Sequence, residues 1–410
     1  MLNQYTTNEM PLGVRLALTG VENEMRISWY TSSQGDAPSV QYSTTPFNPS
    51  DMDAQAMEVA SNNQYTEIAW KGFSVSAVLT QLTPLTTYYY SVGDKSVGIW
   101  SPLYNFTTHL EDDGTFTPFT FVSYGDMGLG GGFNFTIANI VNRIDELSFA
   151  LHIGDIAYAD IRDAGELLFG NQTVWNEFLA ELTPISTKIP YMTAIGNHDL
   201  FSIASGVYRK TFLMPGSNDG KTWYSFDYNG VHFVAVSTEH DYIPTSSQYR
   251  WLENELKNFR ENNPTGWLIV YAHRPVYCSA HYPWCDGRDP FKVVYVDSIE
   301  HLYQKYNVDV YLSGHSHVYE RSLPVYKNQV LGDYSSPKAP IHLVVGTGGN
   351  QEGILHSWQP QPNWSSGTRL LTTGYGLMSF VNETTLHWQF VKDTTNQVLD
   401  ELYITKGYFN

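Results

Sequence analysis

The chain has 410 residues and a formal charge of −18, which results from 41 acidic and 23 basic side chains. This length corresponds to two or three domains, and a pI near 5.0 argues against nucleic-acid binding through a basic surface. No run of about 18 apolar residues occurs, so we expect no membrane span.

The cysteine content and the ends of the sequence bear on the compartment. Cys278 and Cys285 are the only cysteines, which excludes a disulfide-rich scaffold and a four-cysteine zinc site but leaves one local disulfide open. The first residues lack the pattern of a signal peptide, which we expect to be absent or already removed. Secretion, or a vacuolar or lysosomal location, is favoured by Asn-x-Ser/Thr sites at Asn105, Asn134, Asn171, Asn363 and Asn382.

Residues 11 to about 108 are predicted to be all-β, because apolar side chains alternate in short runs that turn residues separate. The segment 82–92, with Tyr88 near its centre, resembles the tyrosine corner of fibronectin type III sandwiches, where a Tyr hydroxyl ties a strand to the upstream connection. We therefore expect a β-sandwich domain over residues 1–110. We interpret it as a scaffold beside a catalytic domain rather than as a binding module.

A polar stretch at 109–115 is the predicted linker. After it, short apolar strands are expected at 119–124, 149–153, 191–195, 267–271, 308–312 and 341–345. Amphipathic helices are expected at 136–147, 174–182, 249–259 and 293–306. Asn229-Gly230 predicts a hairpin turn within 223–233, and residues 377–405 again have the pattern of strands. Residues 115–410 are thus predicted to form an α/β layered domain.

Each of the first five predicted strands of this domain is followed by side chains that can bind a metal ion. In chain order these are Asp126, Asp155 with Tyr158, Asn197 with His198, His273, and His315 with His317. Open α/β sheets place their ligand sites at such strand ends. Oxygen and imidazole donors without a thiolate suit iron, manganese or zinc rather than copper(I). A carboxylate such as Asp155 has two oxygens and could bridge two ions.

The ordered set Asp126, Asp155-x-x-Tyr158, Asn197-His198, His273 and His315-x-His317 resembles the purple acid phosphatases, a branch of the metallophosphoesterases. Further matches are Tyr319-Glu320-Arg321, the stretch 348–353 and Gly374-Tyr375-Gly376. The similarity covers nearly the whole chain, including the sandwich, as in the plant-like members of high mass. It implies that the catalytic domain is a four-layer α-β-β-α sandwich.

The resemblance also implies a ligand set. A ferric ion would be held by Asp126, Asp155, Tyr158 and His317, and a divalent ion (Zn, Mn or Fe) by Asp155, Asn197, His273 and His315. Many metallophosphoesterases have Asp-x-His at the first motif, whereas this chain has Gly128 in place of that histidine. The phenolate of Tyr158 is implied to take over that ligand role.

The implied activity is hydrolysis of phosphomonoesters in acid. Hydroxide on the metal pair would attack phosphorus in line, and a histidine would protonate the leaving group. His198 is the first candidate for that histidine and His281 the second. The family usually has two adjacent histidines near this point, whereas this chain has Ala280-His281-Tyr282, so the choice between the two candidates is open.

Two other functions stay open on the sequence. One is a metallophosphoesterase that acts on phosphodiesters, nucleotides or phosphoanhydrides. The other is a phosphate-binding or adhesive protein with a relic metal site, although a complete ligand set argues against a relic. The expected partners are small-molecule phosphate esters, and the resemblance adds a homodimer as an option. We favour a Cys278–Cys285 disulfide over two free thiols, since it would stiffen the loop over the site.

Overall fold

The computed structural model describes residues 10–51, 56–59, 61–67, 70–109, 116–161, 172–200, 206–216 and 221–406. The predicted linker lies outside these ranges from residue 110 to residue 115.

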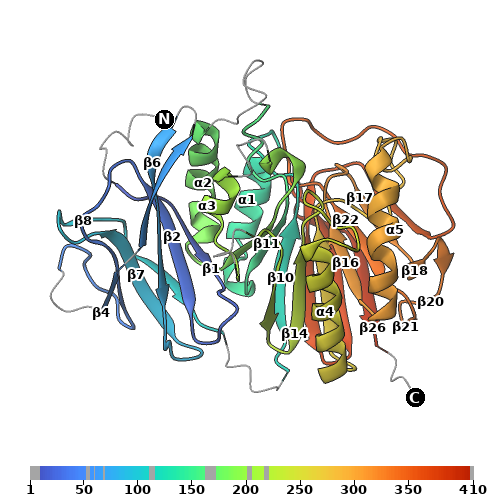
Figure 1. Ribbon diagram of the computed structural model, residues 1–410, viewed down its shortest axis with the longest axis horizontal. Coiled ribbons are helices and arrows are strands. Elements are labelled where there is room, and N and C mark those ends of the chain that lie inside the picture. Colours follow the sequence, from blue (N-terminus) through green and yellow to red (C-terminus); the bar gives the residue numbers. More distant parts are fainter. Residues whose placement is uncertain are drawn as a thin grey trace.

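The N-terminal part is a β-sandwich, drawn in blue in Figure 1. One sheet has the order β1-β2-β6-β5, with β1 (Leu12–Ala17), β2 (Met25–Thr31), β5 (Ser61–Glu67) and β6 (Trp70–Leu79). The other has the order β4-β3-β7-β8, with β9 paired to β7: β3 (Pro38–Ser43), β4 (Ala56–Val59), β7 (Thr87–Asp94), β8 (Ile99–Trp100) and β9 (Tyr104–Thr107).

The predicted tyrosine corner is present in this sandwich. The hydroxyl of Tyr88, on β7, accepts a hydrogen bond from the backbone N–H of Thr83 at 3.0 Å. The alternating apolar residues face inward, and Ile27, Trp29 and Val92 are completely buried. The all-β sandwich is therefore confirmed, together with the local contact that suggested it.

Two further sheets form the C-terminal part. The first has the order β12-β11-β10-β24-β25-β26, with β10 (Phe119–Tyr124), β11 (Ala150–Ile153), β12 (Tyr191–Ala194), β24 (Gly374–Asn382), β25 (Thr385–Lys392) and β26 (Gln397–Thr405). The second has the order β13-β14-β15-β16-β22-β17-β23, with β13 (Tyr224–Tyr228), β14 (Val231–Val236), β15 (Trp267–Ala272), β16 (Val310–Ser313), β17 (Tyr319–Ser322), β22 (Ile341–Val345) and β23 (Ser365–Leu370). Short hairpins pair β18 (Val325–Tyr326) with β19 (Gln329–Val330) and β20 (Gly332–Asp333) with β21 (Ser336–Pro337).

Helices cover the outer faces of these two sheets. They are α1 (Phe133–Val141), α2 (Gln172–Ser186), α3 (Gly206–Thr211), α4 (Ser247–Asn262) and α5 (Pro290–Lys305). Two 3-10 turns, η1 (Ile144–Glu146) and η2 (Asn197–Asp199), lie in the loops after α1 and β12. In Figure 1, α1 to α3 lie between the sandwich and β10–β11, while α4 and α5 lie on the side of β14–β16. The sheets face each other through aromatic contacts, such as Phe121 with Phe233, whose ring centroids are 5.5 Å apart. The predicted four-layer α-β-β-α domain is confirmed.

The hairpin predicted at Asn229-Gly230 joins β13 to β14, and both turn residues have the positive φ that a two-residue turn requires (47° and 78°). From the sequence, β14 was predicted only as one strand of a separate hairpin. In the structure it is an internal strand, parallel to β15. Burial on both faces accounts for its composition, which is apolar except for His232.

The sandwich packs directly against the carboxyl-terminal ends of α2 and α3. The hydroxyl of Ser186 donates to the carbonyl of Val14 at 2.8 Å, and the hydroxyl of Tyr90 donates to the carbonyl of Thr187 at 3.1 Å. The buried guanidinium of Arg15 donates to the carbonyl of Thr211 at 2.5 Å. These buried contacts support the interpretation of the sandwich as a scaffold.

Candidate metal centre

The predicted ligands come together at one edge of the two stacked sheets. Strands β10, β11 and β12 run parallel in the first sheet, and β14, β15 and β16 run parallel in the second. Their carboxyl ends therefore open toward the same edge. The loops that follow them carry the seven predicted ligands, of which all but the half-buried Asn197 are buried.

One group of donors forms around Asp126. The hydroxyl of Tyr158 donates to Asp126 Oδ1 at 3.3 Å and lies 3.0 Å from Nε2 of His317. The same imidazole nitrogen lies 3.3 Å from Asp126 Oδ1. The other ring nitrogen of His317, Nδ1, donates to the carbonyl of Gly353 at 2.9 Å. A carboxylate, a phenol and an imidazole thus converge at one buried position.

A second group forms around Asp155. Nε2 of His273 lies 2.9 Å from Asp155 Oδ2 and 3.2 Å from Asn197 Oδ1. Nδ1 of His273 donates to the carbonyl of Ile153 at 3.0 Å, so Nε2 is the nitrogen that faces the donors. The ring of His315 lies 5.0 Å from that of His273. One ligand atom from each of Asp155, His273 and His315 falls within 4.8 Å of the others.

The donor set fits metal ions. His273 and His317 both use Nδ1 to donate to a backbone carbonyl, which is how histidine ligands are oriented at metal sites. Their Nε2 atoms then face carboxylate oxygens, and only a proton or a cation between them makes such a contact favourable. Burial opposes protonation of His273, but Asp155 raises the pKa of His273 to about 9. Burial and Asp126 raise the pKa of Tyr158 well above its usual value, so the phenol needs a cation nearby to ionise.

The backbone at these positions is strained. Left-handed φ angles occur at Asp126 (59°), Asp155 (51°), Tyr158 (52°) and His315 (64°). Such angles at residues other than glycine cost on the order of 1 kcal/mol or more each, and they cluster at functional sites. Gly154 has a φ of 77°, and a Cβ on it would lie 2.5 Å from Nδ1 of His273, so only glycine allows this approach.

His198 lies at the rim of the cluster, where 14% of its side chain is exposed. Its Nδ1 contacts Asp160 Oδ2 at 2.8 Å, and its ring stacks on that of Tyr158 with centroids 4.3 Å apart. Its Nε2 faces Asp155 and Glu352, each at 3.9 Å. Burial opposes protonation, but Asp155 and Asp160 raise the pKa of His198 to about 10.

Comparison with known families gives a consistent result over most of the chain. Residues 11–108 match the family model described as "Purple acid Phosphatase, N-terminal domain". Residues 119–319 match "Calcineurin-like phosphoesterase", and residues 339–401 match "Iron/zinc purple acid phosphatase-like protein C".

Individual relatives indicate the same family as these models. Human "Acid phosphatase type 7" is 30% identical over 97% of this chain and 92% of its own length. "Probable inactive purple acid phosphatase 1" of Arabidopsis thaliana is also 30% identical, over 97% of this chain and 70% of its own length. The chain belongs to the purple acid phosphatase family. A solved structure of the purple acid phosphatase PPD1 from yellow lupin (Lupinus luteus) seeds has a TM-score of 0.82 at 26% identity, covering 98% of this chain and 75% of that one. Among the described residues, no helix is long and apolar enough to cross a membrane.

The structure does not bring His281, the second catalytic candidate, into the cluster of predicted ligands. The side chain of His281 is exposed, and no hydrogen bond or ion pair among the described residues joins it to a predicted ligand. A bridge between Ala280 and Trp358 and a bond from the His281 N–H to the carbonyl of Ser357 at 3.0 Å fix the backbone here. The next residue, Tyr282, lies against the site instead, with its ring 5.2 Å from that of His315.

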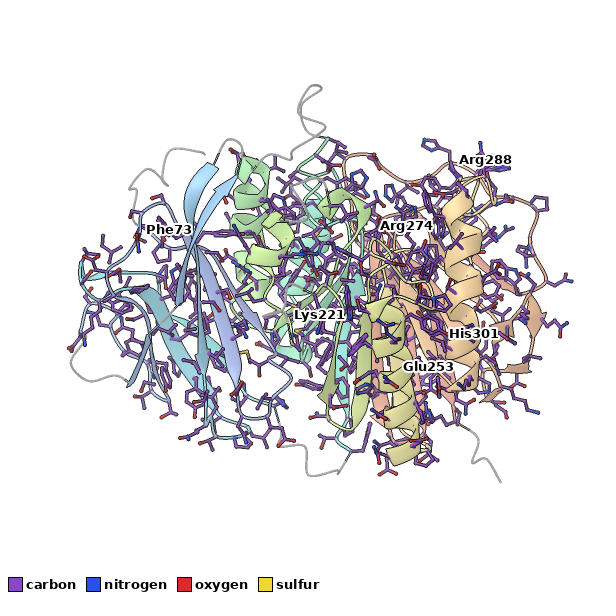
Figure 2. All side chains as sticks on the ribbon, in the orientation of Figure 1. Phe73, Lys221, Glu253, Arg274, Arg288 and His301 are labelled. Atoms are coloured by element: carbon purple, nitrogen blue, oxygen red, sulfur yellow. A yellow bond between two sulfur atoms is a disulfide. The ribbon has the colours of Figure 1, made fainter. Side chains whose placement is uncertain are left out.

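Arg274 is a residue of the site that the sequence reasoning missed. Figure 2 labels it beside the amino end of α5. Its Nη1 donates to Nε2 of His315 at 3.2 Å, while its Nε and Nη2 donate to the two carboxylate oxygens of Glu239 at 2.7 and 3.0 Å. Burial and Arg274 lower the pKa of His315 well below its usual value. The signal in the sequence was the position of Arg274 itself, a basic residue that directly follows the predicted ligand His273.

The loop that carries Tyr282 is closed by the expected disulfide, since Cys278 and Cys285 are bonded with an S–S distance of 2.11 Å. Trp284, inside this loop, has its ring 4.7 Å from the guanidinium carbon of Arg274. The disulfide prediction is confirmed. The closed loop holds two aromatic side chains against the metal-ligand cluster.

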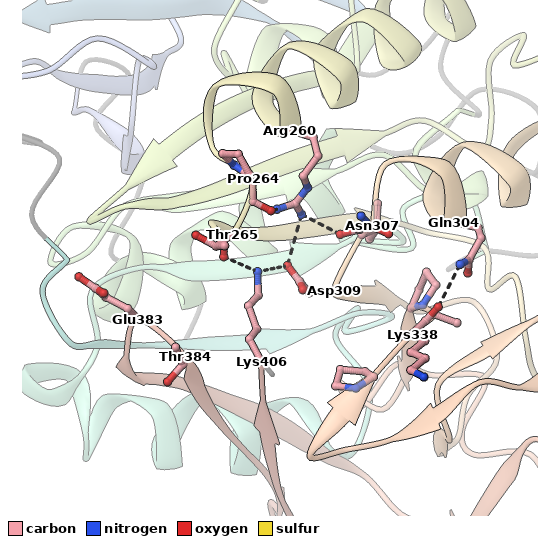
Figure 3. A pocket seen from close by; sticks show the side chains of 14 residues that line it. Arg260, Pro264, Thr265, Gln304, Asn307, Asp309, Lys338, Glu383, Thr384 and Lys406 are labelled. Carbon is pink, nitrogen blue, oxygen red and sulfur yellow. Dashed lines mark hydrogen bonds and ion pairs between the residues drawn. The ribbon is translucent and has the colours of Figure 1, made fainter. Parts of the chain in front are cut away.

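A separate cavity of about 390 Å³ lies at the opposite edge of the sheets (Figure 3). Asp309 accepts from Lys406 at 2.8 Å and from the N–H of Leu268 at 2.8 Å, and Lys406 also donates to the carbonyls of Thr265 and Gly266. Arg260 donates to the carbonyls of Tyr306 at the end of α5, Gly266 before β15 and Asn307 before β16. The charges that line this cavity serve to join structural elements to one another.

Proposed function

We propose that the protein is a di-metal acid phosphatase that hydrolyses phosphomonoesters. The observation that supports it best is the arrangement of the donors in two groups. Asp126, Tyr158 and His317 are in mutual contact, while His273 contacts both Asp155 and Asn197 and has His315 alongside. This division is the one expected for a ferric and a divalent ion that share Asp155.

In this proposal the ferric ion is bound by Asp126, Asp155, Tyr158 and His317, and the divalent ion (Zn, Mn or Fe) by Asp155, Asn197, His273 and His315. The hard phenolate donor favours iron(III) at the first position, and the amide and imidazole donors accept several divalent ions at the second. When bound, the ions would neutralise the phosphate ester and lower the pKa of water. Because the protein itself has a formal charge of −18, it would repel an anionic ester without such cations.

The protein's own residues orient the reaction. His198 is the residue we propose as the proton donor to the leaving oxygen. Asp160 holds Nδ1 of His198, so Nε2 is the nitrogen that faces the ligand cluster and can transfer a proton there. The stacked ring of Tyr158 fixes the orientation of the imidazole. A proton donor held in this way is positioned before the substrate arrives.

The test compares turnover of an aryl phosphomonoester with that of a bis-aryl phosphodiester, at acid pH, by protein whose metal content has been measured. His273→Ala should abolish monoester turnover and lower the metal content, with the sandwich still folded by circular dichroism. His387→Ala, on β25 and outside the ligand cluster, is the matched control and should retain both. Unchanged turnover in His273→Ala would contradict the proposal, and preferred cleavage of the diester would favour a phosphodiesterase.

We also propose that the protein works in a secretory or vacuolar compartment. The disulfide supports an oxidising location. Of the candidate glycosylation sites, Asn134, Asn363 and Asn382 are exposed, and Asn171 lies outside the described residues. Digestion of the natural protein with an endoglycosidase should lower its apparent mass, and an unchanged mass would contradict glycosylation.

A further inference from the structure

A cavity of about 420 Å³ lies between the loop that follows β14 and the amino-terminal half of α5. Residues 238–243 form one wall, and Phe291 and Val294 form the wall opposite. Arg274 and Trp284 line it at the end that lies next to the metal-ligand cluster. This volume is within the range of small-ligand pockets.

Arg274 connects this cavity to the candidate metal centre. It lines the cavity, and its Nη1 is 3.2 Å from Nε2 of the predicted ligand His315. The bidentate pair with Glu239 and the contact with the Trp284 ring hold the guanidinium in place. Arg274 is therefore a residue that the cavity and the metal-ligand cluster share.

The lining of the cavity is apolar where it meets solvent. Phe291 is 66% exposed, Val294 is 44% exposed and Ile243 is 39% exposed, although each is an apolar side chain on an otherwise acidic protein. Three exposed apolar side chains that face one cavity form a surface that an apolar ligand would cover. The buried faces of Tyr242 and Trp284 extend that surface inward.

The charges of the lining exclude a second phosphate as the occupant. Arg274 is the only Lys or Arg among the lining residues, and two of its nitrogens are engaged by Glu239. Asp241 is exposed at the same wall and would repel an anion. Polyphosphate chains need free cations or a metal, so the terminal groups of a nucleoside triphosphate do not suit this cavity.

We propose that this cavity binds the alcohol part of the substrate and selects phosphomonoesters whose alcohol is aromatic or otherwise apolar. The proposal rests on the phosphatase function proposed above, because it takes the metal centre as the position of the phosphoryl group. Arg274 lies at the boundary between the two parts of the substrate. The apolar walls provide affinity that a small polar alcohol, such as glycerol, cannot use.

Binding of uncleavable analogues tests the subsite without turnover. Calorimetry on the metal-loaded protein compares 1-naphthylmethylphosphonate with methylphosphonate. The naphthyl compound should bind at least tenfold more tightly, and Phe291→Ala should reduce that preference by about tenfold, since a lost aromatic contact contributes roughly this much. Phe135→Ala, which removes a ring that is 50% exposed on α1, is the matched control and should preserve the preference.

Equal binding of the two phosphonates by the unaltered protein, or an unchanged preference in Phe291→Ala, overturns the subsite. Val294→Ser is a second variant in the same wall, and its preference should fall as well. Turnover of naphthyl phosphate and glycerol phosphate separates this proposal from the previous one. A protein that prefers the naphthyl phosphonate through Phe291 but cleaves neither ester keeps the subsite and loses the phosphatase function. A protein that cleaves both esters with no dependence on Phe291 keeps the phosphatase function and loses the subsite.

Discussion

Asp199 is predicted to be the main support of the metal-ligand loops, and its replacement by alanine is a quantitative test of how they are held. Its buried carboxyl group accepts three backbone N–H groups from two loops: those of Asp155 at 2.9 Å, Ile156 at 3.0 Å and Gly196 at 2.8 Å. Asp199→Ala leaves all three donors inside the protein without their acceptor. Each loss costs about 1 to 1.5 kcal/mol, so the free energy of unfolding should fall by about 4 kcal/mol.

The assay is urea unfolding, followed by tryptophan fluorescence, of protein freed of metal with a chelator, so that lost metal affinity does not enter the result. Asp333→Ala is the matched control. Asp333 accepts from the N–H groups of Ser335 and Ser336 at 2.9 and 3.0 Å, but it is exposed, and water can replace it. We expect no resolvable change for this control. A loss below about 1 kcal/mol in Asp199→Ala would refute the assigned role of these bonds.

Three further predictions concern other parts of the protein. Asp309→Ala leaves the buried ammonium of Lys406 without its carboxylate, and urea unfolding should show a loss of about 3 kcal/mol. Burial opposes protonation of His232, but its carboxylate neighbours Asp227 and Glu255 raise the pKa of His232 to about 9, above its unfolded value near 6.5. The stability that His232 adds is therefore complete below pH 6.5 and is lost between 6.5 and 9, so the difference in unfolding free energy from His232→Gln should shrink over that interval. The metal-loaded protein should absorb visible light through tyrosinate-to-iron(III) charge transfer, and a spectrum unchanged by Tyr158→Phe would contradict the ferric site.

The sequence predicted the position of the metal-ligand cluster because the relevant signals are local. Each ligand directly follows a short apolar strand, and parallel strands bring their carboxyl ends to one edge. The Asn229-Gly230 turn and the tyrosine corner at Tyr88 are likewise local patterns. Such features depend on neighbours within a few residues, so reading them needs no knowledge of the tertiary structure.

Residues whose roles depend on distant partners were not predicted. Arg274 faces His315 because Glu239, which lies in another loop, accepts from two of its nitrogens. His281 points to solvent because Ala280 pairs with Trp358, a contact that no local pattern announces. Helix α3 is short, so its few residues carry too little periodicity to identify it.

The strain in the metal-ligand loops bears on whether this family member is an active enzyme, since some relatives are named as inactive. The left-handed residues Asp126, Asp155 and His315 each cost on the order of 1 kcal/mol. Burial of the Asp126 and Asp155 carboxylates adds a desolvation cost, against which each accepts one backbone N–H group. A scaffold alone gains nothing from this arrangement, because apolar side chains at the same strand ends would be more stable. Clustered strain of this kind is typical of a functional site, and it agrees with the ion binding proposed above.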